Sequence, residues 1–319
     1  MGTGLAKTRV LIIGIGGQDA RILAKLFAED SAEVWGVSRT PVNPNHKLRD
    51  VSYLVQDVSA PDSFQDLLSS IQPHFIFHLA AVHGSSTQMR VVEQELSWEM
   101  QRCHVEITRN ILDWQLQHKH VKSFIALTSF LYTPTMPKQL IDLSTEFRPQ
   151  GIYGQTKLDA LNLIRKYRND YGIISIGAIL FNHSSRYSKH SFLIPSIARN
   201  LSQLISHRVG LKIENSEKLL DISKAENFCK AFKSLIETSA NQEFIFSSNR
   251  LTSIRNLYED CLLRISPDLM DYVSFDYYGS ELPSMYGDSN GISSFINWEG
   301  GGDIRETILE IAELGSSSR

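Results

Sequence analysis

In the stretch "RVLIIGIGGQDARILAKLF", residues 9–27, a continuous apolar run ends at the first glycine, and a helical pattern follows the glycines. The apolar run over 9–14 is short and ends in a glycine turn, so it predicts a buried strand. Residues 17–29 place their apolar side chains on one face of a helix: Ile22, Leu23, Leu26 and Phe27. A strand, a glycine turn and a helix in this order bring a helix N-terminus to a strand end, which suits a pyrophosphate.

The same alternation of strands and helices continues as far as residue 181. Further strands are expected at 33–38, 52–57, 74–81, 123–129 and 173–181, and helices at 61–71, 91–118 and 152–171. Strands that alternate with helices predict a parallel sheet covered by helices on both faces. Right-handed crossovers then give an α/β, doubly wound Rossmann fold, with ligands at the carboxyl ends of the strands.

After residue 181 the pattern becomes irregular. Amphipathic helices alternate with short strands, and a last helix is expected near 303–314. We therefore predict a dinucleotide-binding Rossmann domain over 1–181, to which part of 215–246 also contributes. Residues 182–319 are expected to form mainly a smaller, C-terminal substrate-binding lobe.

The composition argues against several classes of protein. The net charge of −3 gives no reason to expect nucleic acid or an acidic membrane as a partner. No apolar run reaches about 18 residues, and the N-terminus lacks a signal-like apolar core. The three cysteines form no CxxC pair and the histidines match no zinc pattern. We expect a cytoplasmic protein in a reducing compartment, with no bound metal.

The glycine turn "GIGGQDA", residues 14–20, predicts part of a cofactor site. Gly14 and Gly17 let the backbone turn tightly and approach a pyrophosphate, and Ala20 takes the third glycine position. Such a turn is a weak signal by itself, because glycine turns also join ordinary strands and helices. Its place directly after the first strand favours a dinucleotide.

The end of the second strand bears on the choice of cofactor. NAD sites usually carry an acidic residue there for the ribose hydroxyls, whereas this chain has Ser38 and Arg39. A guanidinium beside a hydroxyl suits the 2′-phosphate of NADP, so NADP is expected and NAD is less favoured. The alternative is that Arg39 is a solvated surface residue. Asp57, at the end of the third strand, either binds the adenine amino group or serves as a turn residue.

The segment "GIYGQTK", residues 151–157, places a tyrosine and a lysine four residues apart at the start of a helix. Residues with this spacing share a face, so Lys157 can lower the pKa of Tyr153 and hold the nicotinamide ribose. Thr128, at the end of a strand, can offer its hydroxyl to the same substrate oxygen. The three residues predict oxidation of an alcohol or reduction of a carbonyl, with hydride transfer by the nicotinamide.

At these motifs the chain resembles the extended short-chain dehydrogenases/reductases that act on nucleotide sugars, and among them the GDP-mannose 4,6-dehydratases. The resemblance covers about residues 8–235 and rests on "GIGGQDA", "HLAA" (78–81), "LTSFLYT" (127–133), "FRPQGIYGQTK" (147–157) and "ILFNH" (179–183). It implies that Thr128, Tyr153 and Lys157 form a catalytic triad.

The resemblance also implies two sets of binding residues. Those for the cofactor are Gly14, Gly17, Gln18, Asp19, Ser38, Arg39, Asp57, Val58, Leu79, Ala80, Ala81, Lys157 and Leu180. Those for the nucleotide-sugar substrate are Ser129, Phe130, Asn182 and Arg186. In the family, helices such as those at 91–118 and 152–171 pair across a two-fold axis, so a homodimer or homotetramer is expected.

Two positions depart from the dehydratase pattern. Phe130 stands where those enzymes carry the glutamate that removes the proton at sugar C5, and Leu220 stands where an arginine contacts the nucleotide phosphates. We therefore expect an NADP-dependent enzyme that oxidises or reduces C4 of a nucleotide sugar. Dehydration should be slow unless another carboxylate, such as Glu146, reaches the site. A 4-epimerase, a 4-keto reductase and a non-catalytic NADP-binding protein are the alternatives.

Overall fold

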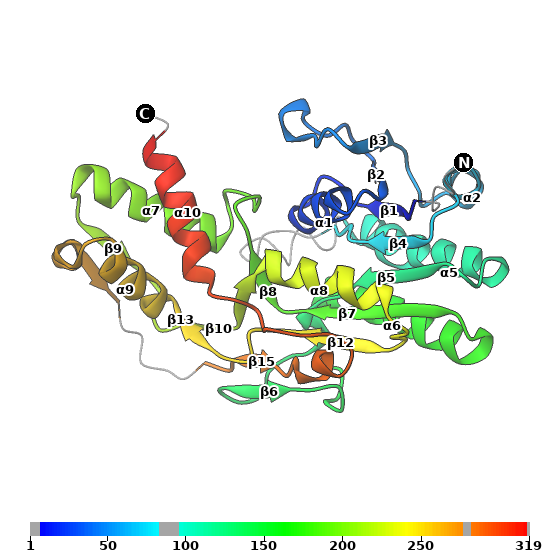
Figure 1. The fold of residues 1–319 in the computed structure, drawn as a ribbon. Helices are drawn as coiled ribbons and strands as arrows, with labels where there is room; N and C mark the ends of the chain where they lie inside the picture. Colours follow the sequence, from blue (N-terminus) through cyan, green and yellow to red (C-terminus); the bar gives the residue numbers. More distant parts are fainter. Residues whose placement is uncertain (1–6, 83–95, 277–281, 318–319) are drawn as a thin grey trace.

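A seven-stranded parallel sheet forms the centre of the computed structural model, which describes residues 7–82, 96–276 and 282–317 (Figure 1). Its strands lie in the order β12–β7–β5–β4–β1–β2–β3, and every neighbouring pair is parallel. They are β1 Arg9–Ile13, β2 Glu33–Ser38, β3 Val51–Val55, β4 Phe75–His78, β5 Lys122–Ala126, β7 Ile174–Leu180 and β12 Glu243–Phe246. The predicted doubly wound α/β fold is confirmed.

Helices cover both faces of the sheet. One face carries α1 (Gln18–Glu29) and α8 (Ala225–Glu237), and the other carries α2 (Pro61–Ile71), α5 (Ile107–Gln117) and α6 (Gly151–Tyr171). In β1, Val10 and Ile12 belong to the first apolar cluster, whereas Leu11 and Ile13 belong to the second. Successive strand residues point to opposite faces, so a strand buried on both faces needs the unbroken apolar run of this sequence.

The long helix expected at 91–118 is described from Ser97 onward, because residues 91–95 lie outside the described part. It consists of α4 (Ser97–Met100), a π-helical turn η2 (Gln101–Glu106) and α5. The N–H of Ile107 donates to the carbonyl of Arg102, five residues earlier. Such π-helical turns are rare in proteins, and those that occur are often found at functional sites.

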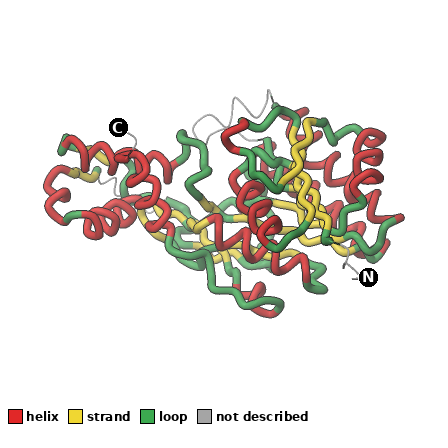
Figure 2. The backbone as a smooth tube through the Cα atoms, turned by 45° about the horizontal axis from the view of Figure 1, so that its top comes forward, coloured by secondary structure: helices red, strands yellow, loops and turns green. Residues whose placement is uncertain are grey.

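A second group of helices lies to one side of the sheet (Figure 2). The helices α7 (Leu193–His207), α9 (Ile254–Ile265) and α10 (Ile304–Ser317) enclose a third apolar cluster of their own. Short strand pairs lie outside the main sheet: β6 Gln139–Ile141 with β15 Met285–Gly287, β8 Asn182–Ser184 with β11 Ile222–Lys224, β9 Leu211–Ile213 with β14 Val273–Phe275, and β10 Leu219–Leu220 with β13 Thr252–Ser253. The 3₁₀ turns are η1 Pro44–His46, η3 Ser129–Leu131, η4 Pro267–Tyr272 and η5 Asn290–Ser294.

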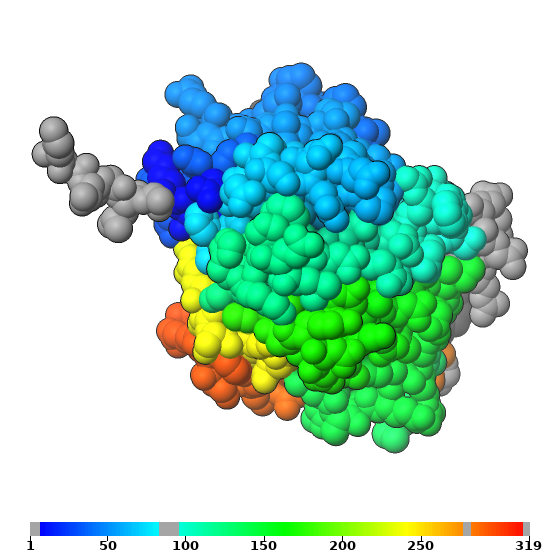
Figure 3. Space-filling model, turned by 90° about the vertical axis from the view of Figure 1, so that its right-hand side faces the viewer, coloured from blue at the N-terminus to red at the C-terminus, as the bar shows by residue number. Residues whose placement is uncertain are grey.

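On the face of the molecule drawn in Figure 3, the sequence colours succeed one another in the order of the strands beneath. Figure 3 shows the early residues in blue above, cyan in the middle and green below, with yellow and orange at the lower edge. This gradient agrees with β2 and β3 at one edge of the sheet and β7 and β12 at the other. Among the described helices, none is long and apolar enough to cross a membrane.

Candidate active site

The glycine turn after β1 has the geometry of a dinucleotide cradle. Gly14 has φ +92°, and a Cβ added there would lie 2.7 Å from the backbone N and Cα of Ala80. Only glycine fits such a backbone conformation at such a close approach. Gly17 occupies the N-cap of α1 with extended backbone and has no side chain to cap the first turn. The N–H groups at the start of α1 therefore suit a pyrophosphate.

The segment after β7 supports this turn. The Gln18 amide donates to the carbonyl of His183 at 3.2 Å and accepts from the hydroxyls of Ser185 and Ser188 at 3.1 and 2.6 Å. Asp19 Oδ2 lies 2.9 Å from Nε2 of His183. Burial acts to lower the pKa of His183, but the Asp19 charge and hydrogen bond raise it overall. The side chains of Gln18 and Asp19 thus tie the turn to the chain after β7.

The remaining predicted cofactor residues lie at the carboxyl ends of the strands. Val58 follows β3, Leu79 to Ala81 follow β4, and Leu180 is the last residue of β7. These strands are close together in the sheet, apart from β3 at its edge. The glycine turn is in contact with the turn after β4, as the short distance between Gly14 and Ala80 shows.

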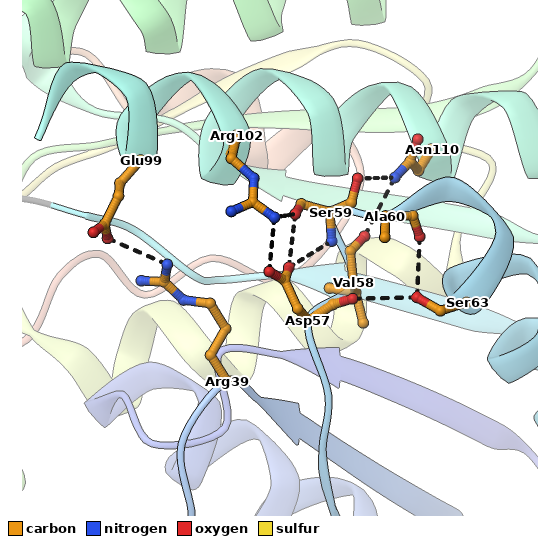
Figure 4. A network of polar contacts seen from close by, with 9 residues as sticks. All are labelled: Arg39, Asp57, Val58, Ser59, Ala60, Ser63, Glu99, Arg102 and Asn110. Carbon is orange, nitrogen blue, oxygen red and sulfur yellow. Dashed lines mark hydrogen bonds and ion pairs between the residues drawn. The ribbon is translucent and has the colours of Figure 1, made fainter.

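Ser38 and Arg39 follow the second strand, where the ribose of a dinucleotide is expected. The Ser38 hydroxyl donates to the carbonyl of Thr40 at 2.7 Å. Arg39 Nη1 lies 3.2 Å from Oε2 of Glu99, which comes from α4 (Figure 4). Glu99 could not be predicted from the sequence, because no local pattern shows that α4 reaches the end of β2.

Asp57 is held in a network beside this pair (Figure 4). It accepts from the backbone N–H and hydroxyl of Ser59 at 3.0 and 2.7 Å, and its Oδ2 lies 2.8 Å from Nη2 of Arg102. Partial burial opposes the change, but the Ser59 hydrogen bonds and the Arg102 charge lower the pKa of Asp57 overall. Asn110 adds hydrogen bonds to the carbonyls of Val58 and Ser59. The Asp57 carboxylate is therefore ionised and fixed near neutral pH.

The structure brings Thr128, Tyr153 and Lys157 together beyond the end of β5. All three are buried, and the Thr128 hydroxyl is hydrogen-bonded to Tyr153. Thr128 also caps the turn η3, accepting from the N–H of Phe130 at 3.2 Å. A Cβ on Gly154 would lie 2.4 Å from the carbonyl oxygen of Phe130, so the first turn of α6 packs directly on η3.

Burial changes the pKa of both residues of the Tyr–Lys pair. It raises the pKa of Tyr153 to about 12, against the effect of the Thr128 hydrogen bond, and lowers the pKa of Lys157 to about 8. The expectation that Lys157 lowers the tyrosine pKa is therefore wrong for this structure. Lys157 Nζ donates to the carbonyl of Ala126 at 2.7 Å, and desolvation of the phenol is the dominant effect.

Two rings contact Tyr153 edge-on. The ring centroid of His104 lies 5.4 Å from that of Tyr153, and the ring of Phe130 lies 5.7 Å away. His104 comes from the π-helical turn, with Nδ1 2.8 Å from Oγ1 of Thr156 and Nε2 3.2 Å from the N–H of Val82. His104 could not be predicted as a site residue from the sequence, because a π-helical turn has no signature in the spacing of apolar residues.

The predicted substrate residues lie in two places. Ser129 and Phe130 are in η3, beside Tyr153. Asn182 begins β8, and its amide donates to the carbonyl of Asp221 at 3.1 Å. Asp221 is buried and its carboxylate accepts four hydrogen bonds, including those from the hydroxyl of Ser247 and the N–H of Gly287. These contacts join the segment after β7 to the end of β12.

Arg186, also predicted to bind substrate, forms an exposed ion pair with Glu310 of α10 at 3.2 Å. Leu220, which replaces the family's arginine, pairs with Thr252 in the small sheet of β10 and β13. Glu146, the alternative carboxylate, lies 2.8 Å from Arg148, and its side chain is 76% exposed. The Glu146 carboxylate is therefore directed to solvent and its arginine partner.

Comparison with known proteins gives relatives over nearly the whole chain. The family "GDP-mannose 4,6 dehydratase" matches residues 11–280. GDP-mannose 4,6 dehydratase 1 of Arabidopsis thaliana is 22% identical over 314 residues, which cover 91% of this chain and 84% of the relative. The human GDP-mannose 4,6 dehydratase is also 22% identical, over 84% of this chain and 75% of its own.

Among solved structures, RMD from Pseudomonas aeruginosa, in complex with NADPH, has a TM-score of 0.75 at 18% identity, covering 98% of this chain and 100% of that one. The dTDP-glucose 4,6-dehydratase of Bacillus anthracis, in complex with NAD, has a TM-score of 0.79 at 12% identity, covering 98% and 97%. These structures share the fold. The family match over residues 11–280 identifies the chain as a member of the GDP-mannose 4,6-dehydratase family, within the extended short-chain dehydrogenases/reductases.

Proposed function

We propose that this chain is an NADP-dependent enzyme that oxidises or reduces C4 of a nucleotide sugar, with Thr128, Tyr153 and Lys157 as its catalytic residues. One observation carries the proposal: at the end of β5 the buried Thr128 and Tyr153 are hydrogen-bonded to each other, and the buried Lys157 binds the carbonyl of Ala126. The same sheet carries, after β1, a turn whose backbone conformation requires glycine at position 14. Family membership supports a nucleotide sugar as the substrate class.

Each residue has a distinct part in the proposed reaction. Tyr153 moves the proton to or from the sugar oxygen, and Thr128 holds both the phenol and that oxygen by hydrogen bonds. Lys157 shares a helical face with Tyr153 and, on this proposal, holds a ribose hydroxyl of the cofactor. A bound nicotinamide would accept or return the hydride. Because burial raises the pKa of Tyr153 to about 12, the phenol is protonated at neutral pH, the form that donates a proton to a carbonyl oxygen.

Phe130 favours a 4-keto reductase or 4-epimerase over a dehydratase. Its ring lies against Tyr153, where the dehydratases carry a base, and a phenyl group accepts no proton. Glu146 is half of an exposed ion pair with Arg148. Reduction and epimerisation at C4 need only the proton and hydride transfers that the three catalytic residues support.

The test is NADPH oxidation by the purified protein with a 4-keto-6-deoxy nucleotide sugar. We expect turnover by the wild type and a loss of about 10²- to 10⁴-fold in Tyr153→Phe. Tyr171→Phe is the matched control, because Tyr171 is exposed at the far end of the same helix. Tight NADPH binding without turnover of any nucleotide sugar would instead identify a non-catalytic dinucleotide-binding protein.

A further inference from the structure

Arg39, the residue proposed to bind the 2′-phosphate, already lies against a carboxylate. Its Nη1 is 3.2 Å from Oε2 of Glu99 (Figure 4). The two side chains are 51% and 43% exposed, so both are open to a ligand that approaches the end of β2. An ion pair as exposed as this one contributes little to stability. The pair can therefore open at low cost.

A second pair beside it is held more firmly. Arg102 follows Glu99 by three residues, which places them on neighbouring positions of one helical face. Arg102 Nη2 contacts Asp57 at 2.8 Å and the Ser59 hydroxyl at 2.6 Å. Two arginines and two carboxylates thus meet over the ends of β2 and β3, and their formal charges cancel. Arg39 and Glu99 are joined by one contact of 3.2 Å, which is longer than the two contacts that hold Arg102. The Arg39–Glu99 pair is therefore the one that exchanges partners more readily.

We propose that Glu99 weakens the preference for NADP by competing with its 2′-phosphate for Arg39. The inference rests on the proposed use of NADP and assigns a role to a residue of another element. A phosphate monoester carries nearly two negative charges at neutral pH, so it attracts Arg39 and is repelled by Glu99. The 2′-hydroxyl of NAD carries no charge and can donate a hydrogen bond to a carboxylate. Arg39 therefore favours NADP, and Glu99 reduces that preference.

The substitution Glu99→Gln tests the competition, because it removes the charge and keeps the size of the side chain. We expect NADPH to bind about 3- to 10-fold more tightly, with NADH unchanged or weaker, measured by the change in cofactor fluorescence on titration. The gain for NADPH should shrink as salt is raised, because exposed charges are screened.

The substitution Arg39→Ala tests whether the effect of Glu99→Gln on NADPH affinity depends on the ion pair between Arg39 and Glu99. By itself this change should weaken NADPH by about 10- to 150-fold and NADH little, since a charge-assisted hydrogen bond is lost. In the Arg39→Ala background, Glu99→Gln should improve NADPH binding by less than in the wild type, because there is no arginine left to compete for. Equal gains in both backgrounds would show simple repulsion and would overturn the competition.

Glu29→Gln is the control for the loss of one negative charge. Glu29 forms a similarly exposed ion pair with Lys25 at the opposite end of α1 from the glycine turn, so its loss should leave both affinities unchanged. If the wild type binds NADPH and Glu99→Gln binds it no better, the inference is refuted while the proposed function stands. If the wild type binds neither cofactor, the proposed function fails and the inference falls with it.

Discussion

Phe130 places an apolar ring 5.7 Å from the ring of Tyr153, at the point in the chain where the dehydratases carry their base. A positioned general base contributes about 10²- to 10⁴-fold to a rate, and a phenyl group supplies none of it. With NADP and GDP-mannose, we therefore expect the 4-keto-6-deoxy product to form far more slowly than about 1 per second, an ordinary enzyme rate. The alkali-visible absorbance of that product is the measurement. Turnover near 1 per second would show that the missing glutamate does not matter.

Single residues were predictable where the signal is local. Tyr153 and Lys157 follow from a spacing of four on one helix, and the approach of Gly14 to Ala80 agrees with a glycine required after the first strand. The contacts of Glu99 and His104 depend on how α4 and the π-helical turn pack on distant strands, which no local spacing contains. The sequence predicted a lowered pKa for Tyr153, whereas burial raises it. Burial depends on the whole fold, so this shift could not be predicted from local spacing.

At the scale of elements, the contact of α6 with η3 depends on Gly154. An added Cβ would lie 2.4 Å from the Phe130 carbonyl oxygen, which belongs to the backbone and has little room to move. We expect Gly154→Ala to lower the free energy of unfolding by about 1–3 kcal/mol, more than the gain of about 1 kcal/mol from better helix propensity.

Urea denaturation measures this loss. Gly291→Ala is the control, because no heavy atom lies within 4 Å of a Cβ added at Gly291. We expect its free energy of unfolding to stay within about 0.5 kcal/mol of the wild-type value. A Gly154→Ala protein as stable as the wild type would mean that η3 moves away from α6 without cost.

Within the first 181 residues, the strands of the main sheet and the helices could be predicted, because each is amphipathic or wholly apolar over its length; the three-residue strand β6, Gln139–Ile141, was not predicted. The expected helix at 152–171 corresponds to α6, Gly151–Tyr171, and that at 61–71 to α2, Pro61–Ile71. Strand ends were less accurate: the run at 74–81 gives a strand only over Phe75–His78. The apolar run continues past His78, but after the hydrogen bond from the Leu79 N–H to the carbonyl of Ile13 the chain packs against Gly14.

At the scale of the molecule, assembly stays a prediction. The helices α5 and α6 cover one face of the sheet, and in the family such helices pair between subunits. We expect sedimentation at micromolar concentration to show a dimer or tetramer of the 36.1 kDa chain. A single species of 36.1 kDa would refute this expectation.

The stability of the whole molecule should depend on pH through His183. Its Nε2 lies 2.9 Å from Asp19 and its Nδ1 lies 2.8 Å from the carbonyl of Phe181, so a doubly protonated ring donates to both acceptors. The pKa of His183 is raised above its ordinary value near 6.5. The stability that it contributes is therefore complete below about pH 6.5 and is lost as the pH rises through the folded-state pKa.

Urea denaturation of His183→Asn at about pH 6 and about pH 9 tests this dependence. The loss of unfolding free energy relative to the wild type should be greater at the lower pH. His46→Asn, at an exposed histidine, should show no such difference. An equal loss at both pH values for His183→Asn would mean that the ring contributes by packing alone.

The position of β12 also bears on how the chain is made. It pairs with β7 in the finished sheet, yet it follows that strand by about 60 residues, or some 3–12 s of translation at about 5–20 residues per second. During that interval, the N–H and C=O groups of β7 that later pair with β12 have no strand partner. An open apolar strand edge is a template for joining other chains. Ribosomes that stop before Glu243 would therefore release a product prone to aggregate, and crowded polysomes would depend on chaperones that shield this edge.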